Sequence, residues 1–140
     1  MKPARSKEHL AFVRSLPCCV SGRTFGVEAA HVGRRGMGQK CSDFETIPLN
    51  ALYHREQHRI GLRAFQRIYE LDIPAVLALI NRKPRITVWD GRYLAQWGEE
   101  TLCLGYLDRG LDFSIRLLRD RVRDLLADRI RARVREFQAR

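Results

Sequence analysis

The chain has 140 residues, of which 45% are hydrophobic and 30% are charged, so it is long enough for one compact domain with a buried core. Lysine and arginine outnumber aspartate and glutamate by 26 to 16, and the resulting net charge of +10 favours a polyanionic partner, nucleic acid first. Because the sequence holds no run of 18 apolar residues and its first residues are too polar for a signal peptide, we expect a soluble, cytoplasmic protein without a membrane function.

The first fifty residues predict one helix and two strands. Ser6 can cap a short amphipathic helix that Pro17 stops. Residues 25–32 predict a short strand, and residues 46–49 predict a second one. Between them the run GRRGMGQK, residues 33–40, is a glycine-rich, cationic loop.

Three helices are predicted next. Asn50 can cap a helix over residues 51–60, which ends at Gly61, a usual residue just after a helix. A second helix follows over residues 62–71, and Asp72 can cap a third.

The character of the sequence changes after Pro84. Two apolar runs flank Asp90-Gly91, which is typical of a type I′ β-hairpin. Residues 101–107 fit either a third strand or the start of a helix. From Asp112 to the end the pattern is that of one long amphipathic helix with nine arginines.

We therefore expect residues 1–83 to form one part of the protein and residues 84–140 a second. The apolar stripe of the last helix continues to Phe137 and needs a cover. Packing on the first part could provide it, and so could a second copy of the same helix in a homodimer.

Four cysteines occur, at positions 18, 19, 41 and 103. Cys18 and Cys19 are neighbours, which seldom pair with each other, so a disulfide framework is not indicated. No CxxC pair is present, which removes the usual sequence signal for a structural zinc.

Three of the four histidines fall in one short window. His31 ends the first predicted strand, and His54 and His58 lie four residues apart on the helix after the second. That spacing places the two imidazoles within about 40° of each other, so both can bind one ion. Two solvated histidines on a polar helix are the alternative interpretation of an HxxxH pair.

This order of parts resembles the ββα-metal motif of the HNH endonuclease superfamily. The blocks PCCVSG from Pro17, EAAHV ending at Val32, GMGQKCSD ending at Asp43 and IPLNALYHREQH ending at His58 are similar to those of small phage and prophage HNH proteins. With the other elements, the resemblance predicts an α+β protein with a ββα-metal core, added helices, a β-hairpin and a long C-terminal helix. It also implies a bacterial or phage-infected cell.

The resemblance implies a role for each histidine. His31 would be the general base, and His54 and His58 would hold one divalent ion, Mg²⁺ or Zn²⁺. A neutral imidazole can accept a proton from water, and a metal held by neutral ligands can offset charge on the phosphate. Basic residues of the loop and the helix would bind the DNA backbone: Arg34, Arg35, Lys40, Arg55 and Arg59.

The sequence also departs from the family pattern. Family members commonly hold a structural zinc at the positions of Cys18, Ser21, Asn50 and Tyr53, and only the first is a zinc ligand here. We therefore expect no structural zinc. Ala30 stands where many HNH proteins carry a metal ligand, so a third ligand would have to be His31 itself or one of three carboxylates, Glu28, Asp43 and Glu45.

Three functions fit these features. The first is a metal-dependent endonuclease that hydrolyses DNA in phage or prophage recombination or replication. The second is a DNA-binding accessory protein of recombination on an inactivated HNH scaffold, with a recombinase or a single-strand-binding protein as a further partner. The third is a protein-interaction module in which the C-terminal helix makes the contact.

Overall fold

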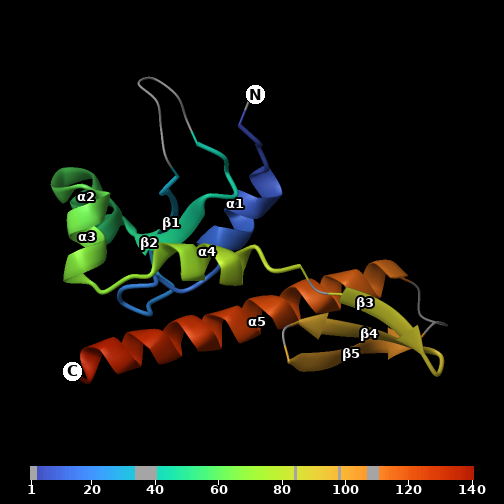
Figure 1. Ribbon diagram of the computed structural model, residues 1–140. Coiled ribbons are helices and arrows are strands. Elements are labelled where there is room, and N and C mark those ends of the chain that lie inside the picture. The colour runs from blue at the N-terminus through green and yellow to red at the C-terminus, as the bar shows by residue number, and fades with distance from the viewer. Residues whose placement is uncertain (1–2, 34–40, 84, 98, 107–110) are drawn as a thin grey trace. The chain divides into compact units, whose positions relative to one another are not determined.

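The computed structural model describes residues 3–33, 41–83, 85–97, 99–106 and 111–140. The predicted loop cations Arg34, Arg35 and Lys40 lie outside these residues. Within them the predicted α+β class is confirmed, with two antiparallel sheets and five helices, of which the last is the long C-terminal helix (Figure 1). The chain folds as two compact units, Met1–Asn81 with Leu126–Arg140, and Arg82–Leu125.

The first unit begins with helix α1 (Lys7–Arg14) and a two-stranded antiparallel sheet. The Ser6 hydroxyl accepts the His9 N–H at 3.1 Å and caps α1 as predicted. Strand β1 (Val27–His31) pairs with strand β2 (Thr46–Asn50) so that Val27 lies opposite Asn50 and His31 opposite Thr46. The first strand is shorter than predicted, because Gly26 has a positive φ of 63° and turns the chain before Val27.

Three helices follow in the first unit. Helix α2 (Ala51–Ile60) starts directly after β2, where the Asn50 side chain accepts the Leu52 N–H at 3.0 Å. Helices α3 (Leu62–Ile68) and α4 (Ile73–Ile80) come next, and Asp72 caps α4. In Figure 1, α1 and α2 flank the β1–β2 hairpin, and both helices contact both strands. Val27 of β1 pairs with Asn50, the residue that precedes α2. The Val27 end of β1 therefore lies next to the start of α2.

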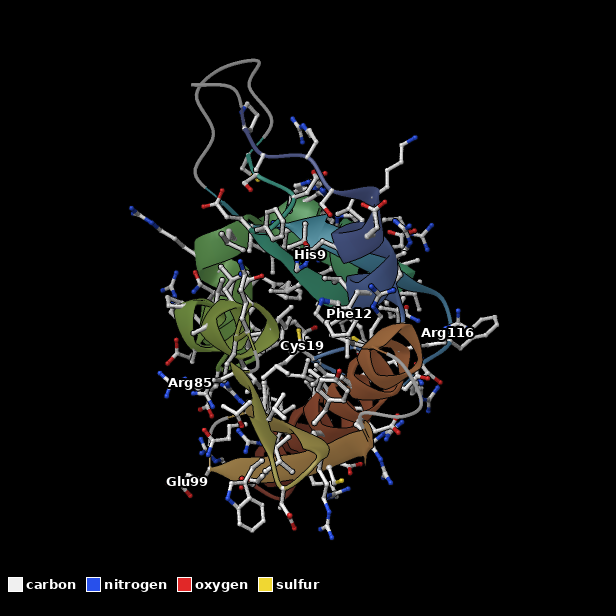
Figure 2. The ribbon with its side chains drawn as sticks, turned by 90° about the vertical axis from the view of Figure 1, so that its right-hand side faces the viewer. His9, Phe12, Cys19, Arg85, Glu99 and Arg116 are labelled. Atoms are coloured by element: carbon white, nitrogen blue, oxygen red, sulfur yellow. The ribbon has the colours of Figure 1, made fainter. Side chains whose placement is uncertain are left out.

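The core of the first unit includes part of helix α5 (Leu111–Gln138). Ile130 and Val134 of α5 are 3% and 5% exposed, and Ile130 lines a small, partly open pocket together with Cys19 and Val76. Cys19 lies inside this unit (Figure 2). The C-terminal half of the apolar stripe is thus covered within one chain, and the homodimer stays a prediction.

The second unit holds a three-stranded antiparallel sheet in the order β3-β4-β5 and the first half of α5. Strands β3 (Arg85–Trp89) and β4 (Arg92–Trp97) form the predicted hairpin, and φ values of 48° at Asp90 and 67° at Gly91 confirm its type I′ turn. Strand β5 (Glu100–Tyr106) decides the open assignment in favour of a strand for residues 101–106, and residue 107 lies outside the described residues. No helix of the described ranges is long and apolar enough to cross a membrane.

Candidate active site

Five of the predicted site residues form two clusters, one around Glu28 and one around His31 of strand β1. Glu28 and His31 are three residues apart on this strand. Because strand side chains alternate between two faces, these two side chains leave β1 on opposite faces. The structure accordingly gives them different partners.

The first cluster joins Glu28 to the histidine pair of α2. His54 Nδ1 lies 2.6 Å from Glu28 Oε2, and His54 Nε2 lies 3.2 Å from His58 Nε2. An ionised Glu28 accepts the proton of His54 Nδ1, which leaves Nε2 of that ring with its lone pair. The predicted pairing of His54 with His58 on one helix face is confirmed.

The distance between the two Nε2 atoms fits the bite of one metal ion. Two imidazole nitrogens bound to zinc at about 2.0–2.1 Å with a tetrahedral angle lie about 3.3 Å apart. The two rings are 4.9 Å apart between centroids, and the His54 side chain is 21% exposed. His58 is exposed as well. The pair can therefore admit an ion from solvent.

Glu28 contacts His54 and does not lie between the two histidine rings. Its contact is with Nδ1 of His54, the nitrogen on the far side of the ring from His58. A carboxylate in this place fixes the ring orientation and raises the basicity of the other nitrogen. Among the residues that the structure describes, no group of three His, Cys, Asp or Glu side chains is arranged to hold an ion.

The second cluster centres on Asp43, whose side chain is only 6% exposed. Its Oδ1 lies 2.9 Å from Arg5 Nη1 and 3.1 Å from His31 Nε2, and its Oδ2 accepts the Ser6 N–H at 2.9 Å. The Ser6 hydrogen bond, then those of His31 and Arg5, outweigh burial and hold the pKa of Asp43 at about 2. Asp43 is therefore an ionised anchor for the end of β1 and for the N-terminal segment.

The third candidate carboxylate, Glu45, closes a turn. Its Oε2 accepts the Ser42 N–H at 3.2 Å, and its carbonyl accepts the Val32 N–H at 2.9 Å. Of the predicted DNA contacts on α2, Arg55 and Arg59 are both exposed, and Arg59 lies 3.9 Å from Glu56. The exposed face of α2 thus carries two cations close in sequence to the histidine pair.

Of the four positions related to a structural zinc, three line one pocket, and the fourth, Cys18, contacts Ser21. The Cys18 sulfur accepts the Ser21 N–H at 3.5 Å, and the Cys18 carbonyl accepts the Gly22 N–H at 2.7 Å. Ser21, Asn50 and Tyr53 line one cavity. A tight turn, a helix cap and an aromatic ring therefore occupy this corner of the first unit.

Sequence reasoning missed Arg5 as a site residue. Arg5 and Asp43 are 38 residues apart, and no local pattern marks a lone arginine before a helix cap as the partner of a distant aspartate. The residues around Asp43 also do not indicate in the sequence that its side chain is buried. The contact between Arg5 and Asp43 is evident only in the folded chain.

These elements define a mixed α+β protein in which an antiparallel hairpin leads into a helix with two adjacent imidazoles. The chain belongs to the family described as protein of unknown function DUF968, whose model matches residues 1–86. That match includes α1 to α4 and both clusters. No curated protein and no solved structure matches the chain.

Proposed function

We propose that the protein is a metal-dependent endonuclease of the HNH type, with β1, β2 and α2 as its ββα-metal core. The observation that carries this proposal is the 3.2 Å separation of the His54 and His58 Nε2 atoms, with Glu28 on the other nitrogen of His54. At this distance the two rings share a hydrogen bond, and a metal ion would take the place of the shared proton, with Glu28 orienting the His54 ring from its other nitrogen.

The metal would be one divalent ion held by His54 and His58. Two imidazoles suit zinc and its transition-metal neighbours better than Mg²⁺, which prefers oxygen ligands. Such an ion would supply positive charge to the scissile phosphate and its leaving oxygen. Ala30, on the same face of β1 as Glu28 and fully buried, offers it no ligand.

His31 would act as the general base, and because it leaves β1 on the face opposite Glu28, the phosphate would have to lie at the end of the strand between the two clusters. Asp43 can accept the proton of His31 Nε2 and orient the ring. His31 would then take a proton from water as the water oxygen bonds to phosphorus and the phosphorus–oxygen bond to the leaving group breaks. Exposed Arg55 and Arg59 would bind the neighbouring phosphates.

The region around Cys18 supports the resemblance to HNH proteins. Ser21, Asn50 and Tyr53 line one cavity, and Ser21 donates to the Cys18 sulfur. Three of the four positions that hold a zinc in HNH proteins line one pocket here and the fourth contacts Ser21, while only Cys18 among them is a zinc ligand. We expect this region to be stable without metal.

Plasmid and single-strand cleavage with Mg²⁺, Mn²⁺, Ni²⁺ and Zn²⁺ tests the proposal. We expect His31→Ala to abolish cleavage while divalent-ion affinity, measured by calorimetry, stays unchanged. His54→Ala should lose both, because it removes a ligand. Thr24→Ala, a change at an exposed residue outside both clusters, is the control and should keep both. Cleavage that survives His31→Ala would contradict the assigned base.

The second candidate function is DNA binding by an HNH scaffold without catalysis. Two observations favour it: the described residues supply no third metal ligand, and His31 contacts Asp43 on the face of β1 opposite Glu28. This function predicts DNA binding that is unaffected by EDTA and by His31→Ala, with no cleavage under any of the four metals.

A further inference from the structure

The three-stranded sheet of the second unit contains no residue of the proposed site, and one of its strands is exposed. All five residues of β3 are exposed, although the strand is rich in β-branched and aromatic residues. Trp89 is 65% exposed, an unusual state for the largest apolar side chain. An exposed indole of this kind suggests that β3 binds another molecule.

The pairing register assigns each residue of the sheet to one face. Residues directly opposite each other share a face, and neighbours along a strand alternate. Ala95 and Trp97 are fully buried, so their face is the inner one, and Ile86 and Val88 lie on it. The opposite face, which we call the outer face, carries Arg85, Thr87, Trp89, Arg92, Leu94 and Gln96.

The outer face is basic and aromatic. Trp89 lies directly opposite Arg92, and Arg85 is four residues from Trp89 on the same strand and the same face. Strand β5 continues this face with Thr101 and Cys103, which are both exposed. The described side chains of the outer face include cations, amide and hydroxyl groups and an indole, and no carboxylate among them.

We propose that the outer face of the β3-β4-β5 sheet binds single-stranded DNA, with Trp89 stacked on a base and Arg85 and Arg92 at the flanking phosphates. An exposed indole provides the flat apolar surface on which an unpaired base stacks, and cations beside it attract the backbone. Arg85 and Trp89 are about 13 Å apart at the rise of a strand, so one extended chain can reach both.

Charge and shape favour a single strand over the other partners of a basic surface. Residues 82–97 hold four cations and one acidic residue, Asp90. A duplex keeps its bases stacked inside, so it would contact the arginines and leave Trp89 unused. An acidic peptide would also leave the indole without a matching flat ring. The proposal concerns the second unit alone and does not depend on hydrolysis at the histidine pair.

Tryptophan emission provides a local readout, because the chain has two tryptophans and Trp97 is fully buried. The full chain is titrated in EDTA with an oligothymidylate of about 15 nucleotides, a length within the site size of small single-strand binders. We expect the emission of Trp89 to be quenched. A fluorophore attached to Cys103, an exposed cysteine on the same face, should respond in the same titration.

Affinities come from the anisotropy of a labelled oligothymidylate. Trp89→Ala should weaken binding by roughly tenfold or more, as loss of one stacked base does. Val88→Ala is the matched control, since Val88 is 57% exposed on the same strand but belongs to the inner face; its affinity should stay within about twofold. Arg85→Gln should reduce the salt slope by about 0.7. Circular dichroism checks that each variant keeps its fold.

Three results would overturn the inference. The first is a Trp89→Ala variant that is folded and binds as tightly as wild type. The second is a duplex of the same length bound as tightly as the single strand, with no quenching. The third is polyglutamate that displaces the oligonucleotide and binds equally to wild type and Trp89→Ala, which would assign the outer face to an acidic protein. Because EDTA prevents cleavage, none of these results bears on the endonuclease proposal.

Discussion

Asp43→Asn is the substitution that most directly tests the second cluster. The ionised carboxylate accepts the Ser6 N–H at 2.9 Å and lies 2.9 Å from Arg5 Nη1 and 3.1 Å from His31 Nε2. Asparagine has nearly the same shape but no charge, and only one of its two side-chain polar atoms accepts hydrogen bonds. The variant therefore keeps the packing around position 43 and removes the charge-assisted part of these contacts.

The size of the effect follows from the pKa of Asp43, which falls from 3.8 to about 2 in the fold. A shift of nearly two units corresponds to about 2.5 kcal/mol at most. The Arg5 side chain is 47% exposed, so solvent screens its share, and we expect a loss of about 1–2 kcal/mol in the free energy of unfolding. Because the folded pKa is the lower one, the stabilisation is complete above about pH 4 and is lost as the pH falls toward 2.

Urea unfolding followed by circular dichroism, at several pH values from 7 down to about 2.5, measures this loss. Wild type should lose stability steeply below pH 4, and Asp43→Asn should start lower and lose less. Asp90→Asn, in the exposed β3–β4 turn, is the control and should stay within about 0.5 kcal/mol of wild type. Equal stabilities of wild type and Asp43→Asn at pH 7 would refute the reasoning, as would parallel pH profiles.

Three further outcomes are expected. Glu28→Gln should weaken divalent-ion binding by roughly tenfold in calorimetry, less than His54→Ala, because it loosens a ligand without removing it; equal affinity in Glu28→Gln and wild type would contradict the role of this carboxylate. EDTA should leave the chain folded at room temperature, since Cys18 alone cannot hold a structural zinc, and unfolding on chelation would show the opposite. Truncation after Asp128 should destabilise the first unit by roughly 3 kcal/mol or more, because it removes buried Ile130, and a truncated chain as stable as the full one would mean that this helix end packs elsewhere.

Features set by neighbouring residues were predictable from the sequence. Ser6 and Asn50 cap helices because a short polar side chain can reach a free N–H two or three residues ahead. The Asp90-Gly91 turn forms because its type needs positive φ at both central residues. The approach of His54 and His58 follows from the helical repeat alone.

Features set by distant pairing were not predictable. The sequence offered Glu28, Asp43 and Glu45 as equal candidates for a metal ligand, because each is a carboxylate near His31. Their actual partners depend on which face of β1 each contact uses and on where the N-terminal segment passes. The cover of the last helix was likewise open, since an apolar stripe does not say whether it meets its own chain or another copy.

The alternation of side chains along β1 limits how this protein can change. Glu28 and His31 serve different faces of one five-residue strand, and their spacing of three fixes that division. Ala30 is fully buried, so a larger side chain there would overpack the core, whereas Ala29 is half-buried on the other face. An inserted or deleted residue at the same place would turn one of the two side chains onto the other's face and separate it from its partner on α2 or at Asp43. Functional variants should therefore keep the number of residues between Glu28 and His31 constant.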